Sequence, residues 1–198
     1  MRLTPKFAVV TLLMVVCVSS AYSQREIPGD LVITLWRSTC FGSCPSYSLT
    51  IATDLTVKFV PLGNPAHRGE GPAPSLPLMG SVTADDLRTL LAEIDKISFW
   101  SLGNNYGNTG KSKTGPTCPK YATDNPSAAI TIERNGKKKT VSHYLGCSGT
   151  QVLDDLEKLE NKIDEIAKTT EWTSQFGWGA ASVVDLQLRV DKAIRQNK

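Results

Sequence analysis

Residues 128–145 read AAITIERNGKKKTVSHYL, and the Asn135-Gly136 pair near their centre is the strongest local signal in the chain. An Asn-Gly pair favours the type I′ turn that joins two antiparallel strands through a two-residue loop. The runs on either side therefore predict a β-hairpin. The second strand of this hairpin places His143 on the same face as Val141 and Leu145, which favours a packed, hydrogen-bonded histidine over a general base.

Three runs upstream of the hairpin also have the character of strands: residues 31–37, 46–52 and 56–62. Apolar and polar side chains alternate along them, which is typical of strands with one buried face. Asp54-Leu55 stands where a tight turn would join the last two, so these runs predict a meander. Residues 63–80 and 101–127 are rich in turn-forming residues and predict two long loops.

Two segments carry the apolar period of an amphipathic helix. The first begins at Thr83, which forms a capping-box pattern with Asp86, and the second begins at Ser148, which forms the same pattern with Gln151. The apolar stripe of the first contains Leu87, Leu90, Leu91 and Ile94, and that of the second contains Val152, Leu156, Leu159, Ile163 and Ile166. Val183, Leu186, Val190 and Ile194 predict a third, C-terminal amphipathic helix.

These elements predict one α+β domain over residues 24–173. We expect a mainly antiparallel sheet of about five strands in the order β-β-β-α-β-β-α, with both helices packed on one face and the other face open to solvent. Residues 174–198 would form a Gly-rich link and the C-terminal helix. The whole chain of 198 residues is 40% apolar and 21% charged, which excludes disordered and membrane-spanning classes of protein.

The first 23 residues have the order of a secretory signal peptide. Arg2 and Lys6 precede an apolar run over residues 7–18, which is shorter than the roughly 20 residues that span a bilayer. We expect cleavage after Ser23 and a periplasmic or extracellular protein without a transmembrane segment. Lipidation of Cys17 is the less favoured alternative. The formal charge of +3 falls further when the leader is removed, so neither a nucleic acid nor an anionic membrane is an expected partner.

Four cysteines remain after the leader: Cys40, Cys44, Cys118 and Cys147. Thiols of exported proteins usually form disulfides, so two bridges are expected, and four cysteines allow 3 connectivities. We favour the pairing of Cys40 with Cys44 and of Cys118 with Cys147.

Two functional alternatives use the same sulfur atoms. A thiol-disulfide redox site at Cys40 and Cys44 is disfavoured, because redox pairs usually have two intervening residues at the start of a helix. A zinc site is disfavoured further, because Cys118 and Cys147 lack a close second ligand pair. No serine or cysteine has a local signature that pairs it with a histidine, so the chain is not expected to be an enzyme and no cofactor or metal is assigned.

The block Cys40-Phe41-Gly42-Ser43-Cys44-Pro45-Ser46-Tyr47 resembles the opening motif of the bacterial domain-of-unknown-function family numbered 6438. The likeness extends over about residues 29–173. Further matching residues are Ile33, Thr34, Leu35, Phe99, Leu102, Tyr106, Thr123, Asp124, Pro126, Val141, His143, Tyr144, Ile163, Asp164 and Trp172. The resemblance implies a small exported or envelope-associated α+β domain and brings no activity.

We therefore expect a non-catalytic binding or interaction module whose partner is an unidentified protein or small ligand. The open sheet face and the two long loops would form the binding surface. Aromatic side chains dominate recognition surfaces where they are exposed. The candidate contact residues on this ground are Phe41, Tyr47, Tyr106, Tyr121 and Tyr144.

Overall fold

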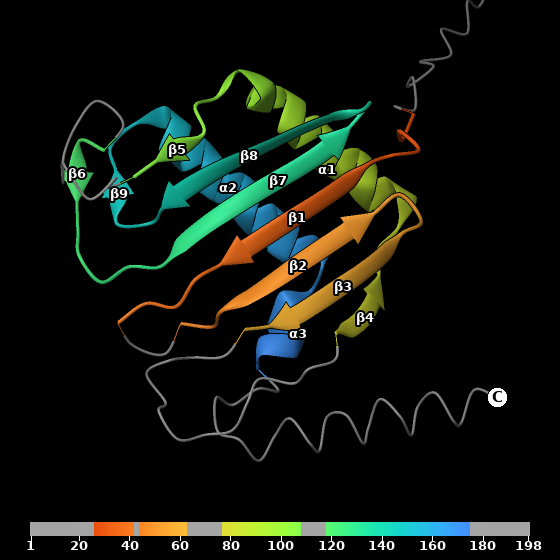
Figure 1. Ribbon diagram of the computed structural model, residues 1–198, viewed down its shortest axis with the longest axis horizontal. Coiled ribbons are helices and arrows are strands. Elements are labelled where there is room, and N and C mark those ends of the chain that lie inside the picture. Colours follow the sequence, from red (N-terminus) through yellow and green to blue (C-terminus); the bar gives the residue numbers. More distant parts are fainter. Residues whose placement is uncertain (1–25, 42–43, 63–76, 108–117, 175–198) are drawn as a thin grey trace, which may run out of the picture.

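The computed structural model describes residues 26–41, 44–62, 77–107 and 118–174. It forms a twisted sheet with helices on one side (Figure 1). The predicted leader, most of the expected loop 63–80, and all but the first residue of the expected C-terminal segment 174–198 lie outside the described residues. None of the helices that the described residues form is long and apolar enough to cross a bilayer.

The main sheet has seven strands in the order β4-β3-β2-β1-β7-β8-β5. All neighbours in this sheet are antiparallel except β5 and β8, which are parallel. Its strands are β1 (Val32–Arg37), β2 (Tyr47–Ala52), β3 (Thr56–Pro61), β4 (Leu78–Ser81), β5 (Asn105–Tyr106), β7 (Ser127–Arg134) and β8 (Lys137–Tyr144). A second, two-stranded sheet joins β6 (Lys120–Tyr121) to β9 (Cys147–Ser148).

The α+β class and the mainly antiparallel sheet agree with the expectation, but the count of five strands was wrong. The additional strands β4 and β5 lie at the two edges of the main sheet and have four and two residues. Strands this short show no alternation in sequence, because their pairing depends on a neighbour that comes from elsewhere in the chain. β5 and all but the last residue of β4 lie in segments that we expected to be loops.

The β7–β8 hairpin is confirmed. Asn135 and Gly136 both have positive φ angles, of 54° and 69°, as a type I′ turn requires. Asp30 fastens this turn from outside the hairpin, because its carboxylate accepts hydrogen bonds from the backbone N–H groups of Asn135 (2.9 Å) and Gly136 (2.6 Å).

Helices α1 (Ala84–Lys96) and α2 (Gln151–Ile166) cover the same face of the main sheet, and the short helix α3 (Thr169–Thr173) follows α2 (Figure 1). A 3-10 turn at Phe99–Ser101 follows α1. The capping box of Thr83 and Asp86 is confirmed. The N-cap of α2 is Thr150 rather than the expected Ser148, because Ser148 pairs in β9.

The hydrophobic core lies between the sheet and the two long helices. Each strand of the main meander turns its buried residues toward them, as Ile33, Leu49 and Ile130 do, and α1 and α2 contribute leucines and isoleucines. The opposite face of the sheet carries hydroxyl pairs, Thr34 with Thr50 and Thr131 with Thr140. This open face is therefore where a binding surface has room to form.

Candidate binding site

A row of residues across four strands forms one end of the open face. Trp36 in β1 is paired with Ala129 in β7, Ala129 with Ser142 in β8, and Ser142 with Asn105 in β5. The side chains of Ala129 and Ser142 are small, whereas the Trp36 side chain stands above the sheet with 37% of its surface exposed. Because small residues lie beside a large one, the face is hollowed at this end.

The resulting cavity has a volume of about 420 Å³. We call it the aromatic pocket, and its lining residues are Trp36, Asn105, Gly107, Tyr121, Ser127, Ser142, His143 and Tyr144. Tyr121 comes from β6, so the small sheet supplies one wall. The imidazole of His143 is buried and bonded to a helix on the other side of the sheet. The side chains that reach the pocket are thus aromatic rings, hydroxyls and one amide.

The ring of Tyr144 is held firmly. Its hydroxyl donates to the carbonyl of Ala122 (2.8 Å) and accepts from the backbone N–H of Asn125 (3.3 Å). The ring also lies 5.5 Å from that of Tyr121. A Cβ atom at Gly107 would lie 2.6 Å from the Tyr144 Cβ, so only glycine fits at that position. The aromatic wall is therefore organised before any ligand arrives.

A largely buried polar cluster, called the buried cluster below, lies beneath the sheet and is formed by Arg37, Tyr47, His143, Glu160 and Asp164. The carboxylate of Asp164 accepts hydrogen bonds from Arg37 Nε (2.7 Å) and the Tyr47 hydroxyl (2.6 Å). His143 Nδ1 lies 3.1 Å from Glu160 Oε1, and Arg37 Nη1 lies 3.8 Å from Glu160 Oε2. The cluster thus ties β1, β2 and β8 to α2.

Two members of this cluster, Arg37 and Tyr47, have shifted pKa values. Burial raises the pKa of Tyr47 well above its usual range, and the charge of Asp164 raises it further. Burial alone would lower the pKa of Arg37, but Asp164, Tyr47 and Glu160 outweigh it and raise the pKa. His143 Nε2 and Glu160 Oε2 are buried and make no hydrogen bond within the described residues. The contact between these two side chains joins β8 to α2 away from solvent.

A second cavity, of about 540 Å³, lies where α2 meets α3. Its lining residues are Pro45, Tyr47, Asn161, Asp164, Glu165, Lys168, Thr169, Thr170, Glu171 and Thr173. The carboxylates on this wall already have partners, because Asp164 bonds to Arg37 and Glu165 pairs with Lys162. A ligand there would compete with the contacts that hold α2, so the aromatic pocket is the better candidate.

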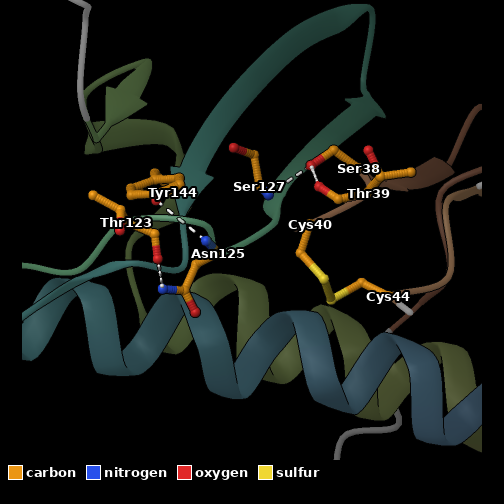
Figure 2. The surroundings of a disulfide bond; sticks show 8 residues. All are labelled: Ser38, Thr39, Cys40, Cys44, Thr123, Asn125, Ser127 and Tyr144. Atoms are coloured by element: carbon orange, nitrogen blue, oxygen red, sulfur yellow. Dashed lines mark hydrogen bonds between the residues drawn. A yellow bond between two sulfur atoms is a disulfide. The ribbon is translucent and has the colours of Figure 1, made fainter. Parts of the chain in front are cut away.

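The structure contains two disulfides, Cys40–Cys44 and Cys118–Cys147, with Cα–Cα distances of 5.4 and 4.9 Å. The first closes the connection from β1 to β2 beside residues 123–127, where the Ser38 hydroxyl accepts from the Ser127 N–H at 2.8 Å (Figure 2). The second is buried, whereas Cys40 and Cys44 are half-buried. All four sulfur atoms of the described cysteines are therefore paired in bridges.

The five predicted contact residues lie in different surroundings. Phe41 is 89% exposed at the Cys40–Cys44 bridge, and its N–H donates to the carbonyl of Asp124. Tyr47 and Tyr106 are core residues with 3% and 8% exposure. Tyr121 and Tyr144 are half-buried and meet in the aromatic pocket. The structure thus brings two of the five together and places two others beneath the surface.

Sequence reasoning missed Trp36 and the charged members of the buried cluster. Trp36 follows Leu35 on the face of β1 that we expected to be wet, and an aromatic residue there was a usable signal. Glu160 interrupts the buried stripe of α2 between Leu156 and Ile163, which was a signal for a buried charge. Arg37 could not be assigned, because its partner Asp164 is 127 residues away.

Comparison with known families adds one match. The family described as a domain of unknown function (DUF6438) matches residues 31–167. This range is more than half of the chain and includes every described residue that lines the aromatic pocket. No curated protein matches the sequence.

Proposed function

The chain belongs to the DUF6438 family of domains of unknown function, and we propose that it has a non-catalytic role. In this proposal it is an exported module that binds a small organic ligand in the aromatic pocket. The observation that carries this proposal is the pocket itself, whose lining brings Trp36, Tyr121 and Tyr144 together on the open face of the sheet. Ligand pockets are typically clefts of roughly 300–1,000 Å³ with aromatic walls and a few polar groups.

The absence of a reactive group among the described side chains of the pocket supports a binding role. Its two serines, Ser127 and Ser142, have no base within reach among the described side chains, because the His143 imidazole faces α2. A nucleophile needs an adjacent base and a group that orients the base. Catalysis at this place is therefore not part of the proposal.

Export is supported by the two disulfides together with the leader-like first 23 residues. Disulfides persist mainly in oxidising compartments. The test is mass spectrometry of the full-length chain after expression and cell fractionation. We expect an N-terminus at Gln24 and no free thiol in the fraction outside the cytosol. A cytosolic chain that keeps Met1 and has reduced cysteines would contradict export.

Ligand binding is tested by nuclear magnetic resonance of the oxidised protein with a library of neutral and charged organic fragments. We expect shifts concentrated at the Trp36 indole N–H and the backbone of Ser142 and Tyr144. The Trp36→Ala variant should lose them. The Met79→Ala variant is the control, because Met79 is an exposed residue of β4 on the same face but outside the pocket. Shifts that avoid the pocket, or that survive Trp36→Ala, would overturn the proposal.

The redox alternative retains one supporting observation, because Cys40 and Cys44 are half-buried and a reductant can reach them. Against it, the bridge connects two strands and lacks a helix N-terminus to stabilise a thiolate. The reduction potential of this pair separates the two functions. A structural bridge should have a potential below about −300 mV, whereas a higher, more oxidising value would favour the redox function.

A further inference from the structure

We propose that the ligand of the aromatic pocket is an uncharged sugar ring, namely one pyranose unit, either free or as part of a longer saccharide. This inference rests on the proposed function, since it names the chemical class that the same pocket accepts. Three properties of the pocket argue for it: the lack of charge among the described residues of its walls, the aromatic faces, and serine hydroxyls and an amide that have no partner within the same residues.

The first property disfavours charged ligands. None of the described side chains that reach the pocket, which are Trp36, Asn105, Tyr121, Ser127, Ser142 and Tyr144, carries a formal charge at neutral pH. The one titratable imidazole of the lining, that of His143, is directed to Glu160 on the opposite side of the sheet. A carboxylate, phosphate or ammonium group would lose water here without gaining a counter-charge, which costs free energy.

The second property favours a ligand with a flat apolar face. Aromatic rings carry negative charge on their faces and attract the weakly positive edges of C–H groups. A pyranose presents several C–H groups on one side of its ring, so it can lie against Trp36 or against the Tyr121–Tyr144 pair. Because Tyr144 is already fixed by Ala122 and Asn125, stacking on it costs little side-chain entropy.

The third property excludes a purely apolar ligand. The hydroxyls of Ser127 and Ser142 and the amide of Asn105 make no hydrogen bond with other described side chains or backbone groups. An apolar ligand would cover these groups and leave them unpaired, at a cost for each. Sugar hydroxyls both donate and accept, so they can satisfy serine hydroxyls and both ends of an amide. A neutral polyhydroxylated ring is the ligand that meets all three conditions.

The experiment is a titration of the oxidised full-length chain with methyl glycosides of glucose, galactose, mannose and N-acetylglucosamine, followed by nuclear magnetic resonance. Glucuronate serves as the charged counterpart and indole as the apolar one. We expect at least one neutral glycoside to shift the Trp36 indole and the Ser142 amide, and glucuronate to bind more weakly. Trp36→Ala should weaken glycoside binding at least about tenfold, whereas Met79→Ala should leave it unchanged.

A second variant separates a sugar from a general apolar ligand. Ser142→Ala removes one hydroxyl and should weaken glycoside binding about threefold to tenfold while leaving indole binding unchanged. Equal losses for both ligands would overturn the saccharide assignment. So would indole binding in the pocket without binding of any neutral glycoside, a result that would leave the proposed function intact. If neither indole nor any fragment or glycoside binds in the pocket, the proposed function fails as well.

Discussion

Asp164 is the residue on which the junction of sheet and helix depends. It accepts hydrogen bonds from Arg37 in β1, from Tyr47 in β2, and from Thr169 at 3.1 Å at the start of α3. One carboxylate thus joins elements from both ends of the described chain. Removing one partner of a buried ion pair is costly because the other charge stays buried without compensation.

Replacing Asp164 with alanine should lower the free energy of unfolding by about 3 kcal/mol, because Arg37 and Tyr47 lose their acceptor. Urea denaturation measures this change. Glu157→Ala is the matched control, since Glu157 lies on the exposed face of the same helix, and its effect should stay within about 0.5 kcal/mol. Equal effects of the two substitutions would show that the cluster does not hold α2.

Asp30 makes the stability of the hairpin turn sensitive to acid. Hydrogen bonds from Gly136 and Asn135 lower the pKa of Asp30 below its usual value of 3.8. A carboxyl whose pKa is lower in the folded state stabilises the protein fully above its unfolded pKa, and the contribution disappears as the pH falls through the folded pKa. Melting temperatures measured between neutral pH and about pH 2 should therefore fall less steeply in Asp30→Asn than in the wild type. Parallel curves would contradict this role.

Among the secondary-structure elements, those that depend on neighbours in sequence were predicted and those that depend on distant partners were not. The hairpin β7–β8 and the helix α1 follow from the Asn135-Gly136 turn and the Thr83 capping box. β5 pairs in parallel with β8, and its two residues, Asn105 and Tyr106, carry no pattern of their own. A two-residue strand exists only because the edge of β8 offers hydrogen bonds to it.

The turn of the hairpin can be tested with two glycines that both have open space around them. Gly136 has a φ of +69° and Gly29 does not have a positive φ, and no atom would lie within 4 Å of a Cβ at either position. Gly136→Ala should destabilise the protein by about 1 kcal/mol, because an L-residue is strained there. Gly29→Ala should be neutral or stabilising by up to about 1 kcal/mol. Thermal unfolding of both variants is the measurement, and a neutral Gly136→Ala would refute the type I′ turn.

Viewed as a whole molecule, the protein has one packed side and one open side. The helices α1 and α2 bury one face of the sheet, while the small sheet β6–β9 lies at one end of the main sheet, beside β7 and β8 (Figure 1). The Cys118–Cys147 disulfide fastens that small sheet, and Tyr121 in it forms a wall of the aromatic pocket. The long bridge therefore supports the pocket as well as the fold.

The two disulfides should differ in what they contribute to stability. The cysteines of the buried bridge are 29 residues apart in sequence and those of the short bridge 4. In the chain-entropy model the buried bridge contributes about 3.6 kcal/mol and the short one about 2 kcal/mol. Guanidinium unfolding of the two double cysteine-to-alanine variants tests this order. A larger loss from the Cys40/Cys44 variant would reverse it, and the Cys118/Cys147 variant should also lose fragment binding in the pocket.

The amino-acid sequence alone was sufficient to predict the features that depend on local chemistry. These are the hairpin at Asn135-Gly136, the apolar stripes of two helices, and an even set of four cysteines. These features depend on residues a few positions apart, and their periods of two and 3.6 are visible along the chain. The aromatic pocket and the buried cluster arise otherwise. Trp36, Ser142 and Asn105 meet through the register of four strands, and Arg37 meets Asp164 across 127 residues. Such contacts form only when the complete sheet pairs and packs, so no local pattern in the sequence predicts them.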